Sequence, residues 1–499
     1  MNETRTRQPK SPMYTSRLLG AAWMVTALVL STAGAAEDNL PVIPGAAAFG
    51  IETPAGSGRH LPSPKTTVYK VTNLNASGPG SLHEAVSAQG PRVVVFEVSG
   101  YIDEPIHIKN PHITIAGQTA PWPGIVLRGG SASGIKTHDV LIQHLTFRPG
   151  GQWEGSHIPH RCGLSTGPES NNIILDHCSF GWTTQVGLNV NGSNTTVRHC
   201  IFSEGFYNSW HCEPDHSKAM GVGLGYQKQK GELRENIAVI GNLFAHCLGR
   251  NPVITAGTSA CVLNNVVYNF PGQGIKAIDG DRVHPKIMSI IGNVYVKGAD
   301  MKPVPGKPWR NNPMWIYLGN PKSTVYLSRD NLFFGQKATD PWQYINARHS
   351  IAKFNEPPVA EAIASQPPLT VPGYEIKPAE QTEDWVLRNA GPFPARRNPI
   401  DARTIYEVKT RTGRGRDNVE DAGGWPELPE NRRKLQLPAN PNGDDDGDGY
   451  TNLENWLHAF SKNVETVTDA DFERNLSFGK EEAARCEVSH EPDLQRMKQ

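Results

Sequence analysis

The sequence of 499 residues has no excess of charge of either sign and few cysteines. Lys and Arg number 49, as do Asp and Glu, so the formal net charge is zero. This balance excludes a polybasic protein that binds nucleic acid or an anionic membrane surface, because both need a net positive field. The seven cysteines are too sparse for a disulfide scaffold, so hydrophobic packing must supply the core.

Apolar runs long enough to span a bilayer, about 20 residues, are also lacking. The longest candidate, residues 18–30, follows a basic leader and precedes the small residues 33–36. This order is typical of a cleaved secretory signal, with an uncleaved anchor as the alternative. We therefore assign residues 1–36 as a signal peptide. We expect an exported protein, secreted or periplasmic, without membrane contact after cleavage.

A degenerate repeat runs through the middle of the chain. Each copy is a short β-branched strand, a turn with His, Cys or Asn, and an aromatic residue. The shortest step between copies, from Cys178 to Cys200, is 22 residues and fits one coil of a parallel β-helix. We therefore predict an all-β solenoid and expect its Asn amides to bond from coil to coil. The column in question contains Leu145, Cys178, Cys200, Asn242, Asn265, Asn293 and Asn331. For Cys178 and Cys200 a buried thiol pair is favoured over a disulfide.

Different sequence flanks the repeat on both sides. Ser81 is a helix N-cap, which predicts a short helix over residues 82–88 that covers the first coil. After Phe334 the repeat fades into polar, Pro-rich sequence. We divide the chain into the β-helix (37–345), an extended tail packed on it (346–440), a calcium loop with a short helix (441–460) and a polar C-terminal extension (461–499).

Several segments, in the expected order, resemble the pectate lyase family (polysaccharide lyase family one). They are residues 71–82, 90–96, 115–121, 176–182, 249–252, 264–269, 389–391 and 423–426. The resemblance implies a right-handed parallel β-helix, a pectin-lyase-like solenoid. It also implies an enzyme that cleaves an acidic (uronate) polysaccharide, pectate or polygalacturonate, by β-elimination. We expect a monomer.

Two other functions stay open. One is a non-catalytic β-helix that binds glycans. The other is a glycoside hydrolase on the same fold, which needs two carboxylates flanking the scissile bond. The Asn-Thr-Asp and paired-Asp signature of β-helix polygalacturonases is not found in the sequence, so hydrolysis is the weaker alternative.

Eliminative cleavage removes the C5 proton beside the uronate carboxylate and expels the glycosidic oxygen at C4. The enzyme must neutralise the carboxylate and supply a base. By the resemblance, Arg250 stands at the position of the catalytic arginine and Lys218 at that of the carboxylate-binding lysine, so we expect them side by side. A guanidinium with a pKa above about 12 is an awkward base. Three neighbours of Lys218 are candidate substrate-binding residues: His216, His211 and Trp210.

The sequence departs from the family at the acidic residues that hold an active-site calcium ion. The positions that resemble them carry Cys162, Gln185 and Asn189, and such neutral groups bind Ca²⁺ poorly. Three interpretations stay open: Lys and Arg neutralise the substrate alone, the substrate is not pectate, or activity is lost. Five acidic residues remain as replacements that spacing does not rank: Asp139, Asp176, Glu204, Glu213 and Asp215. No compact ligand spacing supports zinc.

A second calcium signal lies near the C-terminus and resembles dockerin-type loops. It has carboxylates at positions one, three and five, then a glycine and a backbone carbonyl. Position twelve is Asn455, so the usual bidentate carboxylate is displaced or missing. We predict a structural Ca²⁺ held by Asp444, Asp446, Asp448, Tyr450 and Glu454. An acidic solvated linker is the alternative.

Overall fold

The computed structural model describes most of the chain after residue 39. The described residues are 40–63, 65–129, 132–150, 162–207, 216–224, 233–278, 284–303, 305, 311–318, 320, 322–345 and 363–486. The predicted signal peptide lies outside them, as do His211, Trp210, Glu213 and Asp215.

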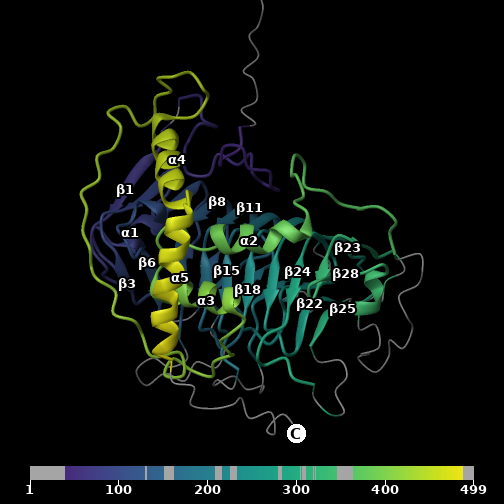
Figure 1. Cartoon of the computed structure of the whole chain (residues 1–499). Coiled ribbons are helices and arrows are strands. Elements are labelled where there is room, and N and C mark those ends of the chain that lie inside the picture. Colours follow the sequence, from purple (N-terminus) through teal and green to yellow (C-terminus); the bar gives the residue numbers. More distant parts are fainter. Residues whose placement is uncertain are drawn as a thin grey trace, which may run out of the picture. The chain divides into compact units, whose positions relative to one another are not determined.

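Three long sheets make up the body of the described chain (Figure 1). In sheet order, the first contains β1 (Thr67–Val71), β2 (Arg92–Phe96), β5 (Ile113–Ala116), β8 (His138–Gln143), β11 (Asn171–Asp176), β14 (Ser193–Arg198), β17 (Arg234–Ile240), β20 (Thr258–Leu263), β23 (Ile287–Ile291) and β26 (Thr324–Leu327). The second contains β25 (Asn312–Tyr317), β22 (Gln273–Ile278), β19 (Val253–Thr255), β16 (Met220–Val222), β13 (Leu188–Val190), β10 (Leu164–Thr166), β7 (Ser133–Ile135) and β4 (His107–Ile108).

The third sheet contains β28 (Gln336–Lys337), β27 (Leu332–Phe333), β24 (Val294–Val296), β21 (Val266–Tyr268), β18 (Leu243–Ala245), β15 (Ile201–Ser203), β12 (Ser179–Gly181), β9 (Leu145–Arg148), β6 (Ile125–Arg128) and β3 (Gly100–Ile102). Neighbouring strands are parallel, except for the antiparallel terminal pair β27–β28. The chain visits the three sheets in turn and then starts the next coil. The predicted right-handed parallel β-helix is therefore confirmed.

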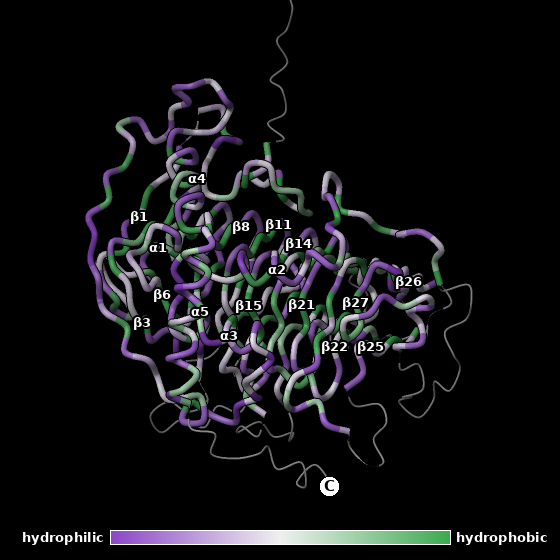
Figure 2. The backbone as a smooth tube through the Cα atoms, viewed as in Figure 1, coloured by the Kyte–Doolittle hydropathy of each residue, from purple (hydrophilic) through white to green (hydrophobic). Residues whose placement is uncertain are grey.

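Identical side chains stack from coil to coil inside the solenoid. The rings of Phe147, Phe180, Phe202 and Phe244 follow one another with centroid separations of 4.9, 5.0 and 4.9 Å. These separations equal the spacing of neighbouring strands, so each ring packs on the next without a gap. Figure 2 shows the hydrophobic residues gathered in the coils, whereas the segment 427–434 that leads towards the C-terminal helices is largely hydrophilic.

The predicted bonds between Asn amides of successive coils are present and form an amide ladder along one turn of the solenoid. Asn242 donates to Asn265 (3.0 Å), Asn265 to Asn293 (2.9 Å) and Asn293 to Asn331 (3.1 Å), each from Nδ2 to Oδ1. All four side chains are buried. In the same column, Cys178 and Cys200 are free, buried thiols, as predicted. The ladder satisfies polar groups that a buried turn would otherwise leave unpaired.

The N-terminal cap agrees with its sequence signature. Helix α1 (Leu82–Ser87) starts at Ser81, whose hydroxyl accepts from the Glu84 amide at 3.2 Å. Its apolar face buries Leu82, Ala85 and Val86 in the same core as the first coils. The helix therefore covers the open end of the core.

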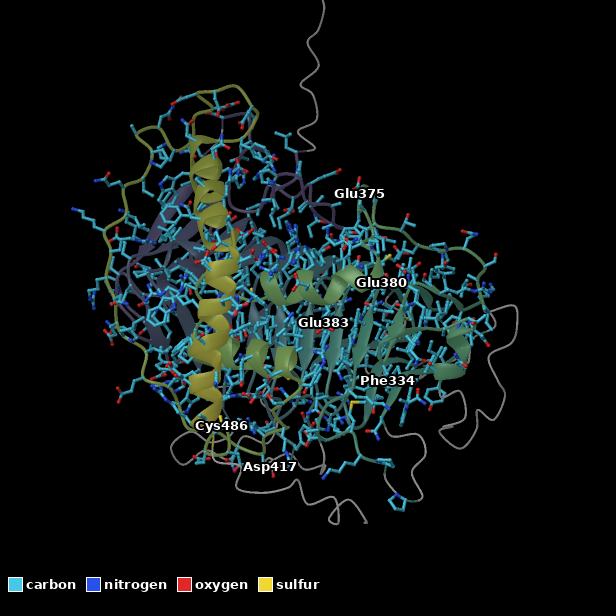
Figure 3. The ribbon with its side chains drawn as sticks, in the orientation of Figure 1. Phe334, Glu375, Glu380, Glu383, Asp417 and Cys486 are labelled. Atoms are coloured by element: carbon cyan, nitrogen blue, oxygen red, sulfur yellow. The ribbon has the colours of Figure 1, made fainter. Side chains whose placement is uncertain are left out.

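The C-terminal part is more helical than the predicted extended tail and polar extension. It contains α2 (Ala379–Asn389), α3 (Pro399–Thr410), α4 (Asn452–Glu465) and α5 (Asp469–Ala484). Helices α2 and α3 bury apolar side chains on the outer face of the third sheet, among them Val386, Leu387 and Ile405. The opposite face of α2 is polar, with Glu380 and Glu383 (Figure 3). Short 3-10 turns lie at η1 (Gly117–Thr119) and η3 (Pro341–Tyr344).

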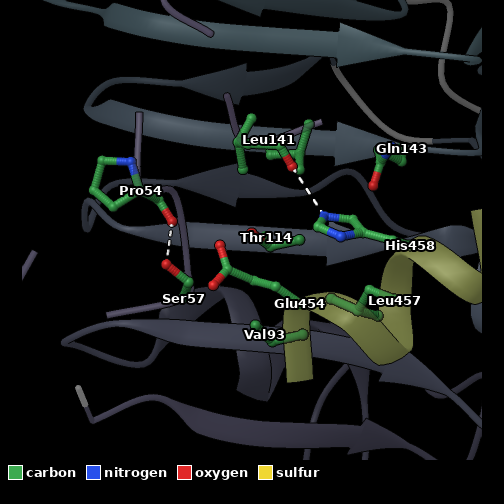
Figure 4. Close-up of a pocket in the computed structure, with 10 residues that line it drawn as sticks. Pro54, Ser57, Val93, Thr114, Leu141, Gln143, Glu454, Leu457 and His458 are labelled. Atoms are coloured by element: carbon green, nitrogen blue, oxygen red, sulfur yellow. Dashed lines mark hydrogen bonds between the residues drawn. The ribbon is translucent and has the colours of Figure 1, made fainter. Parts of the chain in front are cut away.

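Helix α4 covers the first sheet instead. Leu453 and Leu457 pack on Val93 and Val95 of β2. A small cavity beneath the helix is lined by residues of α4 and of the first coils, His458 among them (Figure 4). None of the helices in the described part of the chain combines the length and apolarity needed to cross a bilayer.

Candidate active site

Lys218 and Arg250 lie on neighbouring coils, as expected. They precede β16 and β19, which pair in the second sheet. Lys218 forms a parallel bridge with Gly249, and the Met220 amide donates to the Arg250 carbonyl at 2.9 Å. Both residues are partly exposed. The two cations therefore start from the same edge of the sheet, one strand spacing apart, while their catalytic roles stay predictions.

The turn that carries Arg250 is fixed by its neighbours. Arg250 has a left-handed backbone with φ of 58°. The Asn251 side-chain amide donates from Nδ2 to the carbonyls of Cys247 (3.4 Å) and Gln273 (3.1 Å). At Gly249 a Cβ would stand 2.7 Å from the Gln273 side chain, so a larger residue would require the end of that side chain to move. The Gly-Arg-Asn sequence thus holds the arginine in one orientation of the backbone.

A third cation, Lys276 of β22, lies one coil beyond Arg250. Lys276 pairs with Val253 on one side and with Trp315 on the other, and its amide donates to the Pro252 carbonyl at 2.9 Å. Its Nζ is 5.1 Å from the centre of the Trp315 ring. Burial and the neighbouring Arg250 charge lower the pKa of Lys276 to about 8. Part of this lysine is therefore neutral at mildly alkaline pH.

The sequence alone did not point to Lys276, because the repeat recognised in the sequence lies in the first and third sheets. Strand β22 belongs to the second sheet, where no repeating column was recognised. The available signal was position, since Lys276 follows Arg250 by about one coil.

On the other side of Lys218, the positions that resemble calcium ligands are neutral. The Cys162 thiol donates to Gln185 Oε1 at 2.8 Å. Burial raises the pKa of Cys162 to about 11 although Arg250 opposes this, so the sulfur stays protonated. Asn189 Oδ1 is buried and has no hydrogen-bond partner among the described residues. Two neutral amide oxygens, those of Gln185 and Asn189, are far fewer than the six to eight oxygen ligands that Ca²⁺ takes, so these described residues do not fit an active-site calcium ion.

The acidic replacements considered from the sequence are engaged elsewhere where the structure describes them. Glu204 is fully buried and accepts from Arg403 at 2.7 Å. Asp176 pairs with His177 at 2.9 Å. Asp139 lies 2.6 Å from His138, on the first sheet. None of these three lies on the strands of the second sheet that carry the cations.

Of the three candidate substrate-binding residues, His216 alone belongs to the described part of the chain. His216 is 5% exposed and stands two residues before Lys218. Its role in substrate binding stays a prediction. His211 and Trp210 lie outside the described residues.

The predicted C-terminal calcium loop has three converging carboxylates. One oxygen from each of Asp444, Asp446 and Asp448 lies within 4.8 Å of the others. The Asp444 carboxylate accepts from the amides of Gly447 (2.8 Å) and Gly449 (3.0 Å), which fixes its direction. Slight desolvation and the nearby Asp448 charge raise the pKa of Asp446. A cation would relieve this repulsion, and hard oxygen donors suit Ca²⁺.

The other two predicted ligands of this loop differ in position. Glu454 does not reach it. One of its oxygens accepts from Thr451, which it caps at the start of α4, and the other pairs with Arg59 at 3.1 Å. Capping and pairing explain why this glutamate points away from the loop. The Tyr450 hydroxyl donates to the Pro41 carbonyl. The predicted metal ligand of Tyr450 is its own backbone carbonyl. Asn455 Nδ2 lies 3.2 Å from Asp448 and holds position twelve.

The sequence is similar to curated proteins along most of its length. No family model matches the sequence. Probable pectate lyase C of Neosartorya fischeri is 29% identical over 449 residues, which cover 85% of this chain and 94% of that protein. The protein of the same name from Aspergillus terreus is 32% identical over 262 residues, 52% of this chain and 55% of that one. A solved pectate lyase bound to a hexasaccharide matches with a TM-score of 0.48 at 12% identity, covering 72% of this chain and 99% of that chain.

The relatives define the class of the chain. A parallel β-helix whose sequence matches curated lyases along most of its length confirms the predicted enzyme class, a polysaccharide lyase. Within that class, the confirmed resemblance is to pectate lyases, and the curated relatives reported above are both named pectate lyase C.

Proposed function

We propose that this protein is an exported lyase that cleaves a uronate polysaccharide, pectate or polygalacturonate, by β-elimination. The observation that carries the proposal is the run of Lys218, Arg250 and Lys276 on three successive coils of one sheet. The chain as a whole has no net charge, so this run is a local feature. A polymer with a carboxylate on every sugar matches cations repeated at the coil spacing.

Lys218 and Arg250 act on the uronate at the cleavage point. Lys218 binds the carboxylate and thereby makes the C5 proton more acidic, and Arg250 stabilises the charge that develops as this proton leaves. The C5–H bond breaks and its electrons stay at C5, where the neighbouring carboxylate delocalises them. They form the C4–C5 double bond as the C4–O bond breaks, and the glycosidic oxygen leaves with the electron pair of the C4–O bond and takes up a proton from water.

Lys276 is the group best suited to accept the C5 proton. The arginine guanidinium stays protonated in proteins. Lys276, with its pKa near 8, has a neutral fraction at the pH where a base is needed. Arg250 contributes to lowering that pKa, so the two residues act together.

We propose that calcium takes no part in this chemistry, because the described residues at the positions that resemble calcium ligands, Cys162, Gln185 and Asn189, are neutral. The C-terminal loop is different. We propose that Asp444, Asp446, Asp448 and the Tyr450 carbonyl hold a structural Ca²⁺, with Asn455 beside them. The ion would stabilise the loop that leads into α4 and supply no chemistry to the cleavage reaction.

Product analysis tests the proposal. The purified protein is incubated with polygalacturonate and other uronate polymers, and the ends produced are identified. Unsaturated uronate ends support the lyase. Saturated ends would indicate a hydrolase, and tight binding without cleavage would indicate a glycan-binding protein; either result rejects the proposal.

Variants then test the site. We expect Lys218→Ala and Arg250→Ala to abolish cleavage with an unchanged circular dichroism spectrum. Lys136→Ala, an exposed lysine after β7 of the same sheet, is the matched control and should keep full activity. Full activity in the first two variants removes these residues from the site.

A further inference from the structure

Coil stacking brings two histidines and a carboxylate together on the first sheet. Ile113 of β5 pairs with Val140 of β8, so the preceding residues His112 and Asp139 face each other across neighbouring coils. His112 Nδ1 lies 3.8 Å from Asp139 Oδ2, and His138 Nδ1 lies 2.6 Å from the same oxygen. The three ligand atoms all lie within 4.8 Å of one another.

The surroundings orient this group. Asp139 Oδ1 accepts from Thr53 Oγ1 (2.7 Å) and Asn172 Nδ2 (3.1 Å), which leaves Oδ2 facing the histidines. His60 stacks on His112 with ring centroids 4.2 Å apart. His112 Nδ1 is buried and has no hydrogen-bond partner within the described part of the chain. Supporting bonds of this kind to a ligating carboxylate are typical of metal sites.

The distances suit a zinc-like ion. Tetrahedral zinc, with bonds of about 2.0–2.1 Å, separates its ligand atoms by about 3.4 Å. On metal binding, His138 Nδ1 and Asp139 Oδ2 would therefore move apart from 2.6 Å. His112 Nδ1 and Asp139 Oδ2 would approach from 3.8 Å. Each change is less than about 1 Å. Two imidazoles and one carboxylate favour a transition metal over Ca²⁺, which prefers oxygen alone.

We propose that His112, His138 and Asp139 bind a divalent transition-metal ion of the zinc class, with a fourth position open to water. The ion would link β5, β8 and, through Thr53, the segment before β1. The proposal does not depend on the lyase activity, because these residues lie on the first sheet and the cations of the active site on the second.

A second histidine group makes a useful contrast. His144, His177 and Glu465 also converge, but His144 bonds to Glu465 (3.0 Å) and His177 to Asp176 (2.9 Å). Both of these rings are almost completely buried, which leaves no room for a water ligand, whereas the side chain of His138 is 50% exposed.

Cobalt titration tests the proposal. The metal-free full-length protein is titrated with Co²⁺ in excess Ca²⁺, which we expect to occupy the C-terminal acidic loop. We expect one Co²⁺ per chain with the visible absorption of a tetrahedral site, and displacement of Co²⁺ by Zn²⁺. His112→Ala, His138→Ala and the conservative Asp139→Asn should each weaken binding at least about tenfold. His83→Ala, an exposed histidine on α1, should not.

Thermal unfolding supplies a second readout. Zn²⁺ should raise the melting temperature of the wild type and of His83→Ala, but not that of Asp139→Asn, because binding to the folded state stabilises it. Absence of stoichiometric binding overturns the proposal. Equal affinity in the wild type and all three site variants also overturns it, because the metal would then be held elsewhere.

Discussion

The buried ion pair between the tail and the solenoid gives a sharp prediction. Arg403 of α3 donates from Nη2 to both oxygens of Glu204, at 2.8 and 2.7 Å, and from Nε at 3.2 Å. Glu204 follows β15 and has no exposed surface. In Arg403→Met the carboxylate stays buried with the Trp182 indole N–H as its nearest remaining donor, at 2.7 Å, and Arg416 at 4.0 Å. We expect the free energy of unfolding to fall by about 3–5 kcal/mol at pH 7.

The pH dependence follows from the same contacts. Burial acts against the charged form, but Arg403 and Arg416 hold the pKa of Glu204 below its ordinary value. A depressed carboxyl pKa contributes stability that is present above the unfolded pKa of about 4.3 and is lost as the pH falls below it. In Arg403→Met this contribution should shrink or reverse.

Urea unfolding followed by circular dichroism measures both effects. The double variant Glu204→Gln/Arg403→Met serves as the control, because it removes the buried charge together with its partner and should recover part of the loss. A loss below about 1 kcal/mol in Arg403→Met, or an unchanged acid dependence, would refute the reasoning.

Three further predictions concern the ladder, the base and the loop. In Asn293→Ala the amide groups of Asn265 and Asn331 lose their partner in the ladder, at a cost of about 1–3 kcal/mol for each buried group. The free energy of unfolding should therefore fall by about 3 kcal/mol. A change below about 1 kcal/mol in urea unfolding contradicts this. In the wild type kcat/KM should rise as the pH increases through about 8, because neutral Lys276 is the base, and Lys276→Arg should lose this rise; a matching profile in the variant excludes Lys276 as the base. Ca²⁺ should raise the melting temperature of the wild type more than that of Asp446→Asn, whereas chelator should leave cleavage intact; chelator-abolished cleavage would place calcium in the chemistry.

The sequence predicted those parts of the fold in which one residue type recurs at the coil spacing. Asn265 and Asn293 marked the ladder because a buried turn amide must find a partner in the next coil. The tail helices were missed because the repeat ends before them and the surrounding sequence is rich in proline. Their stability comes from packing on the third sheet, as with Val386 and Ile405, and local sequence does not display such contacts.

The candidate site, like the fold, was predicted from the sequence only in part. Lys218 and Arg250 were proposed through the family resemblance, and the structure places them on neighbouring coils. Lys276 was missed because the repeat was recognised only in the other two sheets, and the stacking of the second sheet then showed which strand lies beside Arg250. The group of His112 and Asp139 was missed for a similar reason, since residues far apart in sequence become neighbours only through the coil register.

The central claim is that the cation run on the second sheet cleaves a uronate polymer by elimination. Its most direct test is digestion of a defined oligogalacturonate, followed by mass spectrometry of the fragments. Elimination breaks the chain without adding water, so we predict one unsaturated fragment per cut and two fragment masses that sum to the mass of the substrate, with no cleavage by Arg250→Ala. Saturated fragments whose masses sum to the substrate plus one water, or undiminished cleavage by Arg250→Ala, would contradict the account.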